Sequence, residues 1–511
     1  MTKASPQASP MDRREGRIFA LFLLLFFASG FSALLYQVIW QRLLALFGGA
    51  DVYSVTIIVS AYMAGLGCGS LAGGVLADRV GLRGRLHAFV FSELAIAAFA
   101  FVSVPLYYDL LYVRLGALVD SRLALAGILF LTLLWPTFYM GMSLPLLSKA
   151  LTSTSALASR RIAGLYGINT LGAAVGSVMT MAVLARSYGF GTTVRIGAAV
   201  NLCCALGALV LARRVRSGQS PAAVAAPAVV ESGGRPALFS LPIWIALYAL
   251  SGYVALSLEI VWFRVLGVLI KANAFTFAVL LAMFLSFVGI GTLLARPLAE
   301  RSRRPAAVFL VLQAAIPFYA GLSLTVLIVG LGSAGILDAV WGHVGGYEGI
   351  PMDAALRKLW RTIATAGQSS PMAQSLASQV VWIWGIVPLA LMAPPTLLMG
   401  MSFTFLQRAI QTDLAFIGRR LGWLQTANIA GSLFGACFTG LFLLRFIGSS
   451  GTLRLLVVLG GLYLLLACRP LAGRSGLGRA AALAACACAT ALVAWKIPDS
   501  SILWAKLHGT T

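Results

Sequence analysis

A small set of charged, amide and indole side chains lies inside long apolar stretches of the sequence, where contact with a solute is possible. A polar group in such surroundings costs free energy unless it meets a partner, a cation or water. A carboxylate there can hold a proton or a cation, and an amide can hydrogen-bond a solute. The candidate substrate-binding residues are Glu259, Gln37, Arg42, Arg264, Asn169, Asn428, Trp40, Trp262 and Glu93.

Two opposite charges in this set, Glu259 and Arg264, are five residues apart. On one helix this places them about 140° from each other around the axis, so they cannot form an ion pair within it. Each therefore requires a partner on another helix or water in a cavity. We expect a cavity lined by the first, fifth, seventh and eleventh membrane helices. The alternative is a set of structural pairs between helices, with the arginines extending to the membrane surface.

The sequence indicates neither a catalytic constellation nor a metal site. All seven cysteines lie in apolar runs without a CxxC spacing, and the three histidines are far apart. We therefore expect no catalytic residues, no metal and no cofactor in this chain. Its net charge of +23 would suggest nucleic acid for a soluble protein. The basic residues lie instead in short loops between apolar runs, which indicates a lipid bilayer as the partner and excludes nucleic acid.

Composition and apolar runs predict an all-α polytopic membrane protein. The chain is 60% hydrophobic and 10% charged, whereas soluble domains carry about 25% charged residues. Apolar runs long enough to cross the hydrocarbon as helices recur along the whole length. The expected spans are 18–47, 53–77, 86–108, 122–148, 162–186, 194–212, 241–270, 273–297, 305–330, 379–406, 420–446 and 452–468, with a possible thirteenth helix at 480–495.

The chain is a tandem duplication. The segment Ser29–Arg42 returns as Ser251–Arg264 with a constant offset of 222 in the numbering, and Pro136–Ser143 returns as Pro395–Ser402 with an offset of 259. Six spans per half is an even number, so we expect two parallel six-helix repeats of the major facilitator kind. Gln37 aligns with Glu259, so the acid is present in the second half alone. This makes Glu259 the best candidate for binding a cation or a proton, with Arg42 as the alternative partner.

The change of offset places an insertion in the second half, at about 332–378. We expect it on the outer side, either as a loop or with a short amphipathic helix at 353–366 lying on the membrane surface. The expected organisation is a cytoplasmic tail at 1–17, a first repeat at 18–212, a flexible cytoplasmic linker at 213–240, a second repeat at 241–468, and an extra helix with a tail at 469–511.

The distribution of Lys and Arg predicts the orientation. With the N-terminus inside, the inner segments hold 24 of the 38 basic residues, and each inner segment has at least three. One inner loop, after the second span, carries the motif Gly74, Asp78, Arg79, Gly81 and Arg83. Its glycine allows a neighbouring helix to approach, and its aspartate can interact with a helix N-terminus. This motif resembles the loop signature of the major facilitator superfamily.

Three longer stretches resemble the membrane part of bacterial fused major facilitator/spermidine synthases. They are the segment from Ser29, the glycine-rich span ending at Asp78-Arg79, and Gly164–Ala173. In that family a Glu commonly stands where this chain has Gln37. The resemblance implies a bacterial inner-membrane protein that acts as a transporter or channelling module for polyamines or related small cations. The alternative is a non-transporting anchor or partner of a soluble spermidine synthase-like domain, which this chain lacks and which would be required for aminopropyltransferase activity.

Overall fold

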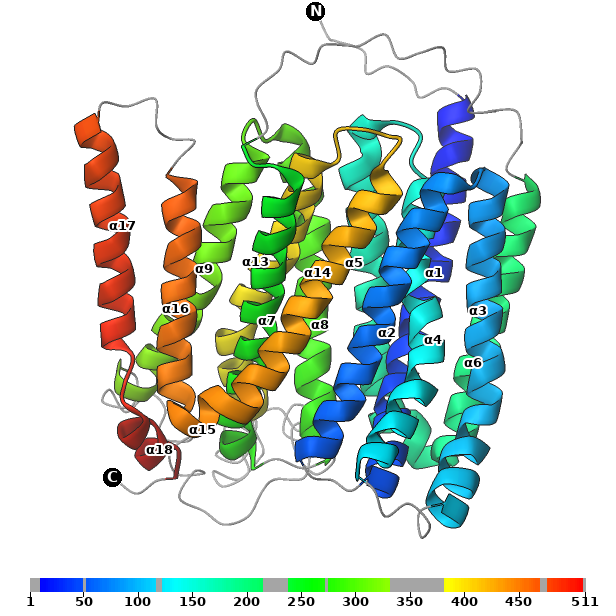
Figure 1. Cartoon of the computed structure of the whole chain (residues 1–511), viewed down its shortest axis with the longest axis horizontal. Coiled ribbons are helices and arrows are strands. Elements are labelled where there is room, and N and C mark those ends of the chain that lie inside the picture. The colour runs from blue at the N-terminus through cyan, green and yellow to red at the C-terminus, as the bar shows by residue number, and fades with distance from the viewer. Residues whose placement is uncertain are drawn as a thin grey trace, which may run out of the picture.

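The structure is a computed structural model that describes residues 10–48, 52–115, 122–214, 238–271, 274–330, 381–468 and 476–508. All regular elements within these residues are helical (Figure 1). The first half contains α1 (Pro10–Gly48), α2 (Val52–Arg79), α3 (Leu82–Val104), α4 (Arg122–Ala150), α5 (Ser155–Met179) and α6 (Ala185–Arg214). The second contains α7 (Leu241–Ile270), α8 (Ala274–Arg301), α9 (Pro305–Thr325), α13 (Val387–Ile410), α14 (Ile417–Phe438), α15 (Leu444–Phe446) and α16 (Gly448–Ala467), followed by α17 (Gly476–Lys496) and α18 (Ser500–His508).

All twelve expected spans and the thirteenth helix are present as helices. The largest differences are at two helix starts. Helix α1 begins at Pro10 and so includes part of the segment expected as a tail, and α6 begins at Ala185 rather than at 194. A helix satisfies its own backbone hydrogen bonds, so it can continue beyond the apolar run into water. Most of the linker and the whole insertion, including the possible amphipathic helix at 353–366, lie outside the described residues.

The two halves repeat one packing scheme in parallel. Within the first half, α1 packs on α5, α2 on α4, and α3 on α6. Within the second, α7 packs on α14, α8 on α13, and α9 on α16. Each pair of the second half is the duplicate of a pair of the first, which confirms the parallel six-helix repeats expected from the two offsets.

Close helix contacts at glycines repeat in the same way. A Cβ atom at Gly172 would overlap the carbonyl oxygen of Phe27, and one at Gly431 would overlap that of Ala249. The two glycines, and the two residues that they contact, are duplicates of each other. Small residues let helix backbones approach closely in lipid, where packing replaces the hydrophobic effect as the driving force. The duplicated glycines therefore fix the distance between α1 and α5 and between α7 and α14.

Short π-helical turns interrupt corresponding helices. One lies at Thr180–Leu184 after α5, and its duplicate lies at Thr439–Leu443 after α14. Others follow α3 at Pro105–Leu115 and α9 at Val326–Gly330, and one precedes α13 at Val381–Ile386. Such turns are rare and change the direction of the side chains that follow them.

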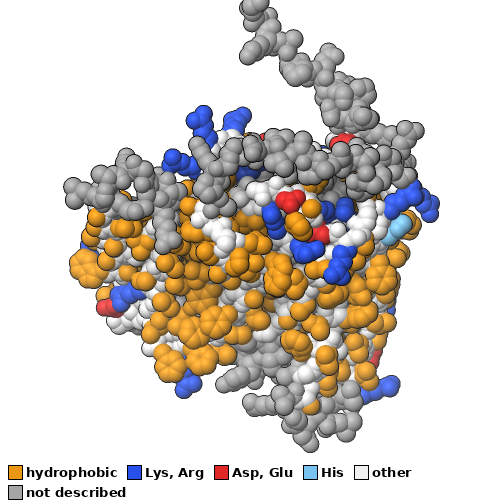
Figure 2. All heavy atoms as spheres, turned by 45° about the horizontal axis from the view of Figure 1, so that its top comes forward, with side chains coloured by type: hydrophobic (Ala, Val, Ile, Leu, Met, Phe, Trp, Pro, Cys, Tyr) orange, Lys and Arg blue, Asp and Glu red, His pale blue; other side chains and the backbone are white. Residues whose placement is uncertain are grey.

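The surface is that of a membrane protein. Eleven stretches of described residues are long and apolar enough to cross a bilayer, one of which, Ser155–Arg213, contains both α5 and α6. The bent pair α17 and α18, with an angle of 44°, would add one more. Figure 2 shows a broad band of hydrophobic side chains below an upper end where Lys and Arg gather. We call that end, where α2 is followed by α3, the motif face.

The two largest contacts between the halves are equivalent to each other. Helix α2 of the first half packs on α14 of the second, and α8 of the second half packs on α5 of the first. Helix α17 lies outside this arrangement, against α16 and α9 at one edge of the bundle (Figure 1). It runs from the motif face to the opposite face, where α18 lies. Among the described residues, the interface between the halves is therefore built mainly from helices of the duplicated core.

Candidate substrate cavity

A cavity of about 700 Å³ lies between the two halves. This volume is within the range of small-molecule binding sites. Helices α1, α5, α7 and α14 line it, as expected, and α2, α4, α8 and α13 contribute as well. Equivalent positions of the two halves face the same space. Three such pairs of lining residues are Gln37 with Glu259, Asn169 with Asn428, and Met140 with Met399.

Glu259 is the one charged side chain among the described residues that line this cavity. It is buried, and within the described part of the chain no donor or cation lies at hydrogen-bond or salt-bridge distance from its carboxylate. Arg42 does not serve as its partner and is not among the lining residues. Leaving a carboxylate unpaired in an apolar cavity is costly unless a proton or a ligand compensates it.

The two asparagines bind neighbouring backbone and also line the cavity. The Asn169 amide nitrogen donates to the carbonyl oxygen of Phe26 at 2.9 Å, and that of Asn428 donates to Tyr248 at 3.1 Å. Tyr248 is the duplicate of Phe26, so the duplication conserves both donor and acceptor. Each asparagine thus fixes a contact between helices at the wall of the cavity.

Three aromatic residues form a cluster in the wall of the cavity. The rings of Tyr166 and Phe403 have centroids 4.3 Å apart, and Tyr248 lies 6.4 Å from Phe403. These residues come from α5, α13 and α7, and all three line the cavity. The cluster therefore joins the two halves at the cavity wall, since α5 belongs to the first half and α7 and α13 to the second.

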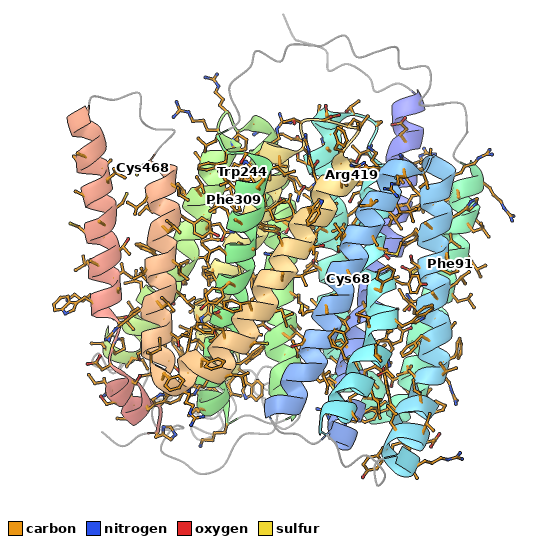
Figure 3. The ribbon with its side chains drawn as sticks, in the orientation of Figure 1. Cys68, Phe91, Trp244, Phe309, Arg419 and Cys468 are labelled. Atoms are coloured by element: carbon orange, nitrogen blue, oxygen red, sulfur yellow. The ribbon has the colours of Figure 1, made fainter. Side chains whose placement is uncertain are left out.

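Asp78 of the loop motif connects the halves at the motif face. Its carboxylate oxygens accept hydrogen bonds from the backbone N–H groups of Gly418 at 3.0 Å and Arg419 at 2.8 Å, at the start of α14. Its side chain is 3% exposed, and it forms an ion pair with Lys149 at 3.3 Å. Figure 3 shows Arg419 at this end of α14. A negative charge at a helix N-terminus is favourable because the free N–H groups point toward it.

Gly74 makes this contact possible. A Cβ atom there would lie 2.5 Å from the carbonyl oxygen of Gly418, so α2 and α14 could not approach as closely with a larger residue. Both contacts expected of the motif, the helix approach and the helix N-terminus, are thus present. Arg79 and Arg83 are exposed at the same face, and Gly81 precedes the first turn of α3.

The equivalent contact between α8 and α5 is looser. Glu300, which aligns with Asp78, forms an ion pair with Arg160 at 3.6 Å, with the side chains 35% and 52% exposed respectively. Arg296 stands where Gly74 does, and its guanidinium lies over Gly164 of α5. The motif face is therefore held together unequally, with one buried link and one exposed link.

The structure places four expected site residues away from the cavity. Trp40 is fully buried in the first half, where it stacks on Tyr36 and donates to the Ser103 hydroxyl at 3.0 Å. Trp262 is packed in the core of the second half. Arg264 is exposed and lies over the ring of Trp504 in α18, 4.8 Å from its centroid. The fourth is Arg42, which is half-buried but does not line the cavity.

Glu93 lies behind the cavity wall and is fully buried within the first half. Its carboxylate accepts hydrogen bonds from Ser29 and Asn201. These partners were not expected from the sequence, and neither was Lys149 as the partner of Asp78. A signal for Lys149 existed, since Arg408 occupies the duplicated position in the second half. Asn201 has no polar counterpart, so the duplication could not have indicated it.

Two parallel six-helix halves around a central cavity, joined at a glycine and aspartate motif, define a membrane protein with the major facilitator fold. A bacterial homologue of the iron transporter ferroportin, crystallised in an outward-facing state, is 12% identical with a TM-score of 0.53, covering 94% of this chain and 99% of that chain. The E. coli fucose:proton symporter is also 12% identical, with a TM-score of 0.50 and coverage of 89% and 98%. No protein-family model and no curated protein matches the chain. The structural similarity concerns the fold, and the link to spermidine synthases rests on sequence motifs.

Proposed function

We propose that this protein is an alternating-access transporter of a small organic cation, which Glu259 binds between the two halves. The observation that carries the proposal is one unpaired carboxylate in a cavity whose described lining is otherwise uncharged. A cationic solute would neutralise that charge and remove its desolvation cost. The two solved structures named above are described as a ferroportin homologue and a symporter, which supports a transport role.

The lining indicates the kind of cation. Phe263, Phe284 and Tyr248 present aromatic groups, and methionine and leucine side chains cover much of the remaining wall. Aromatic faces attract a cation, and apolar walls bind a hydrocarbon body. One carboxylate matches one positive charge. An amine with a single charge and an apolar body therefore suits the cavity better than a polyamine, although polyamines belong to the class that the family resemblance implies.

Transport would proceed by rocking of the halves about the cavity. We infer that the motif face is closed in the present structure, because the Asp78 contacts hold α2 against the start of α14 there. Opening this face requires α2 to separate from the start of α14, and closing the opposite face would complete the cycle. The buried Asp78 link is the contact that must break.

Solute counterflow in proteoliposomes tests the proposal. Vesicles loaded with unlabelled phenyltrimethylammonium should take up the labelled compound transiently, with at least about tenfold more uptake than protein-free vesicles. External benzoate, an aromatic anion of similar size, should not compete. Spermidine should compete less strongly than the monovalent cation. Absence of counterflow for the monovalent cation and for spermidine would contradict transport and favour the alternative of a non-transporting partner of a synthase.

We further propose that the motif face is cytoplasmic, in a bacterial inner membrane, because the Lys and Arg bias marks the inner side. A cysteine at Ser217, in the segment between the halves, should remain unlabelled when intact cells are treated with a membrane-impermeant maleimide. The same cysteine should be labelled after permeabilisation. A cysteine at Asn273, between α7 and α8, is the matched control on the other side. Labelling of Ser217→Cys from outside intact cells would reverse this orientation.

A further inference from the structure

Glu93 belongs to a closed hydrogen-bond network inside the first half. The Ser29 hydroxyl donates to Oε1 at 2.7 Å, and the Asn201 amide donates to Oε2 at 2.6 Å. The Tyr36 hydroxyl in turn donates to the Asn201 amide oxygen at 2.7 Å. The network joins α1, α3 and α6, and Glu93 itself is fully buried.

The network borders a second cavity of about 190 Å³. Both donors to Glu93, Ser29 and Asn201, line this side cavity. The side cavity and the central cavity share lining residues, among them Gln37 and Asn169. A space of this size with several polar groups can hold water molecules. The donors to Glu93 therefore line a cavity with both polar and apolar walls that adjoins the proposed solute site.

The fold does not require this network. The positions equivalent to Glu93, Asn201 and Tyr36 in the second half are Ala315, Gly460 and Leu258. The second half thus packs the corresponding helices α9 and α16 without a buried acid. Burying a carboxylate costs free energy. Since the second half packs without one, packing alone does not explain why the first half has it. At these positions the network is present in the first half alone. In the same way, the unpaired carboxylate of Glu259 is present in the second half alone.

We propose that Glu93 is a proton-binding site that couples solute movement in the central cavity to proton movement. This inference rests on the proposed transport function. A protonated Glu93 needs an acceptor for its new O–H group. The Ser29 hydroxyl can change from donor to acceptor, whereas the Asn201 amide nitrogen can only donate. The proton is therefore held at Oε1, between Glu93 and Ser29.

Protonation at this atom acts on α1. Ser29 must then direct its own hydroxyl hydrogen elsewhere, which changes the hydrogen bond between α1 and α3. Leu34 and Gln37 of the same helix line the central cavity. The state of Glu93 thus reaches the solute site through one rigid helix. The proton enters Glu93 when the cavity is open to one side of the membrane and leaves when it is open to the other.

Other titratable groups near Glu93 are few. Tyr36 faces it from α1, and the thiol of Cys204 faces it from α6 and donates to the Leu25 carbonyl at 3.3 Å. On α4, the charged side chain that the structure describes is Lys149, which pairs with Asp78. No described Lys or Arg lies within salt-bridge distance of Glu93. Gain or loss of the proton therefore changes the net charge of this site directly.

Two measurements on proteoliposomes with the membrane potential held at zero test the coupling. A gradient of one pH unit should drive about tenfold accumulation of labelled phenyltrimethylammonium when imposed in one direction, if one proton moves per solute. Glu93→Gln should abolish this accumulation and keep counterflow within about threefold of the unchanged protein. Gradient-driven accumulation that persists in Glu93→Gln would overturn the inference while leaving the transport proposal intact.

An infrared difference spectrum recorded across a pH titration provides a readout that needs no transport. The carbonyl band that belongs to protonated Glu93 should be absent in Glu93→Gln and shifted in Ser29→Ala, which removes the partner at Oε1. Ser92→Ala is the control. It removes a buried hydroxyl on α3, the helix of Glu93, that donates to the backbone of the same helix, and it should leave the band unchanged. If no titrating band depends on Glu93, the site does not bind a proton. If the band is present and counterflow fails, the transport proposal is wrong while the proton site stands.

Discussion

Glu259→Gln is expected to weaken the binding of phenyltrimethylammonium in the central cavity by about 100-fold or more. Removing one partner of a charge pair in a buried site costs about 3–5 kcal/mol, and about 1.4 kcal/mol corresponds to a tenfold change in affinity. Glutamine keeps the shape of the side chain and copies the residue that the first half has at position 37. Binding to purified protein, measured by calorimetry or by displacement of a labelled cation, gives the change directly.

The duplication offers a rescue for this variant. Adding Gln37→Glu to Glu259→Gln moves the acid to the equivalent position on the other side of the same cavity, which both residues line. We expect the double variant to recover binding to within about tenfold of the unchanged protein. Glu300→Gln removes an acid outside the cavity and should leave binding unaffected. Unchanged affinity in Glu259→Gln would show that Glu259 is a structural residue, and the cation site would have to be sought elsewhere.

Asp78→Asn is expected to shift the conformational equilibrium toward states with an open motif face by about 100-fold. The substitution removes the charge that pairs with buried Lys149 and weakens the two hydrogen bonds to the start of α14. Removing one partner of a buried ion pair costs about 3–5 kcal/mol. This cost falls entirely on the state with a closed motif face, because the ion pair is formed in that state alone. Spin labels at Arg79 and Phe416, on the two sides of this contact, should report longer and broader distances in the variant.

Glu300→Gln is the matched control for this prediction. Glu300 is the duplicate of Asp78, but its ion pair with Arg160 is largely exposed. Exposed ion pairs contribute about 0–1 kcal/mol, so this variant should shift the equilibrium by less than about fivefold. Equal distance distributions in Asp78→Asn and in the unchanged protein would mean that the Asp78 contact does not control the opening of the motif face.

The architecture was predictable because lipid and duplication constrain it independently. A bilayer fixes the length of each apolar run, so all twelve spans and the extra helix could be located within several residues. The two offsets then fixed the parallel relation of the halves. The close helix approach at Gly74 and the contact of Asp78 with a helix N-terminus were also predictable, since these contacts require those residue types. That the partner is α14 was not predicted.

Individual partners were less predictable than helices. Asn201 is far from Glu93 in the sequence, and its counterpart is a glycine, so neither spacing nor repetition indicates the pair. Trp40 and Trp262 are duplicates of each other, but both lie in hydrophobic cores. Duplication conserves packing residues as readily as binding residues, so it does not distinguish the two roles. Arg264 shows the same limit, since its side chain lies over Trp504 of a helix that has no duplicate. Which face of a helix meets the cavity depends on packing angles and on the π-helical turns, and composition does not reveal these.

The matching π-helical turns bear on the history of the chain. A rare backbone irregularity at Thr180–Leu184 that recurs at the duplicated positions Thr439–Leu443 is most simply inherited from one six-helix ancestor. The contact of α2 with α14 and that of α8 with α5 are then one contact seen twice, which is the arrangement of an isologous dimer. On this inference, the present interface between the halves corresponds to the subunit interface of such a dimer. In such a dimer every residue occurred twice, so an acid at position 37 or 259 would have faced its own copy. Gene fusion allowed the two copies to diverge, and the unequal pairs Gln37 with Glu259 and Arg296 with Gly74 record the symmetry that was lost.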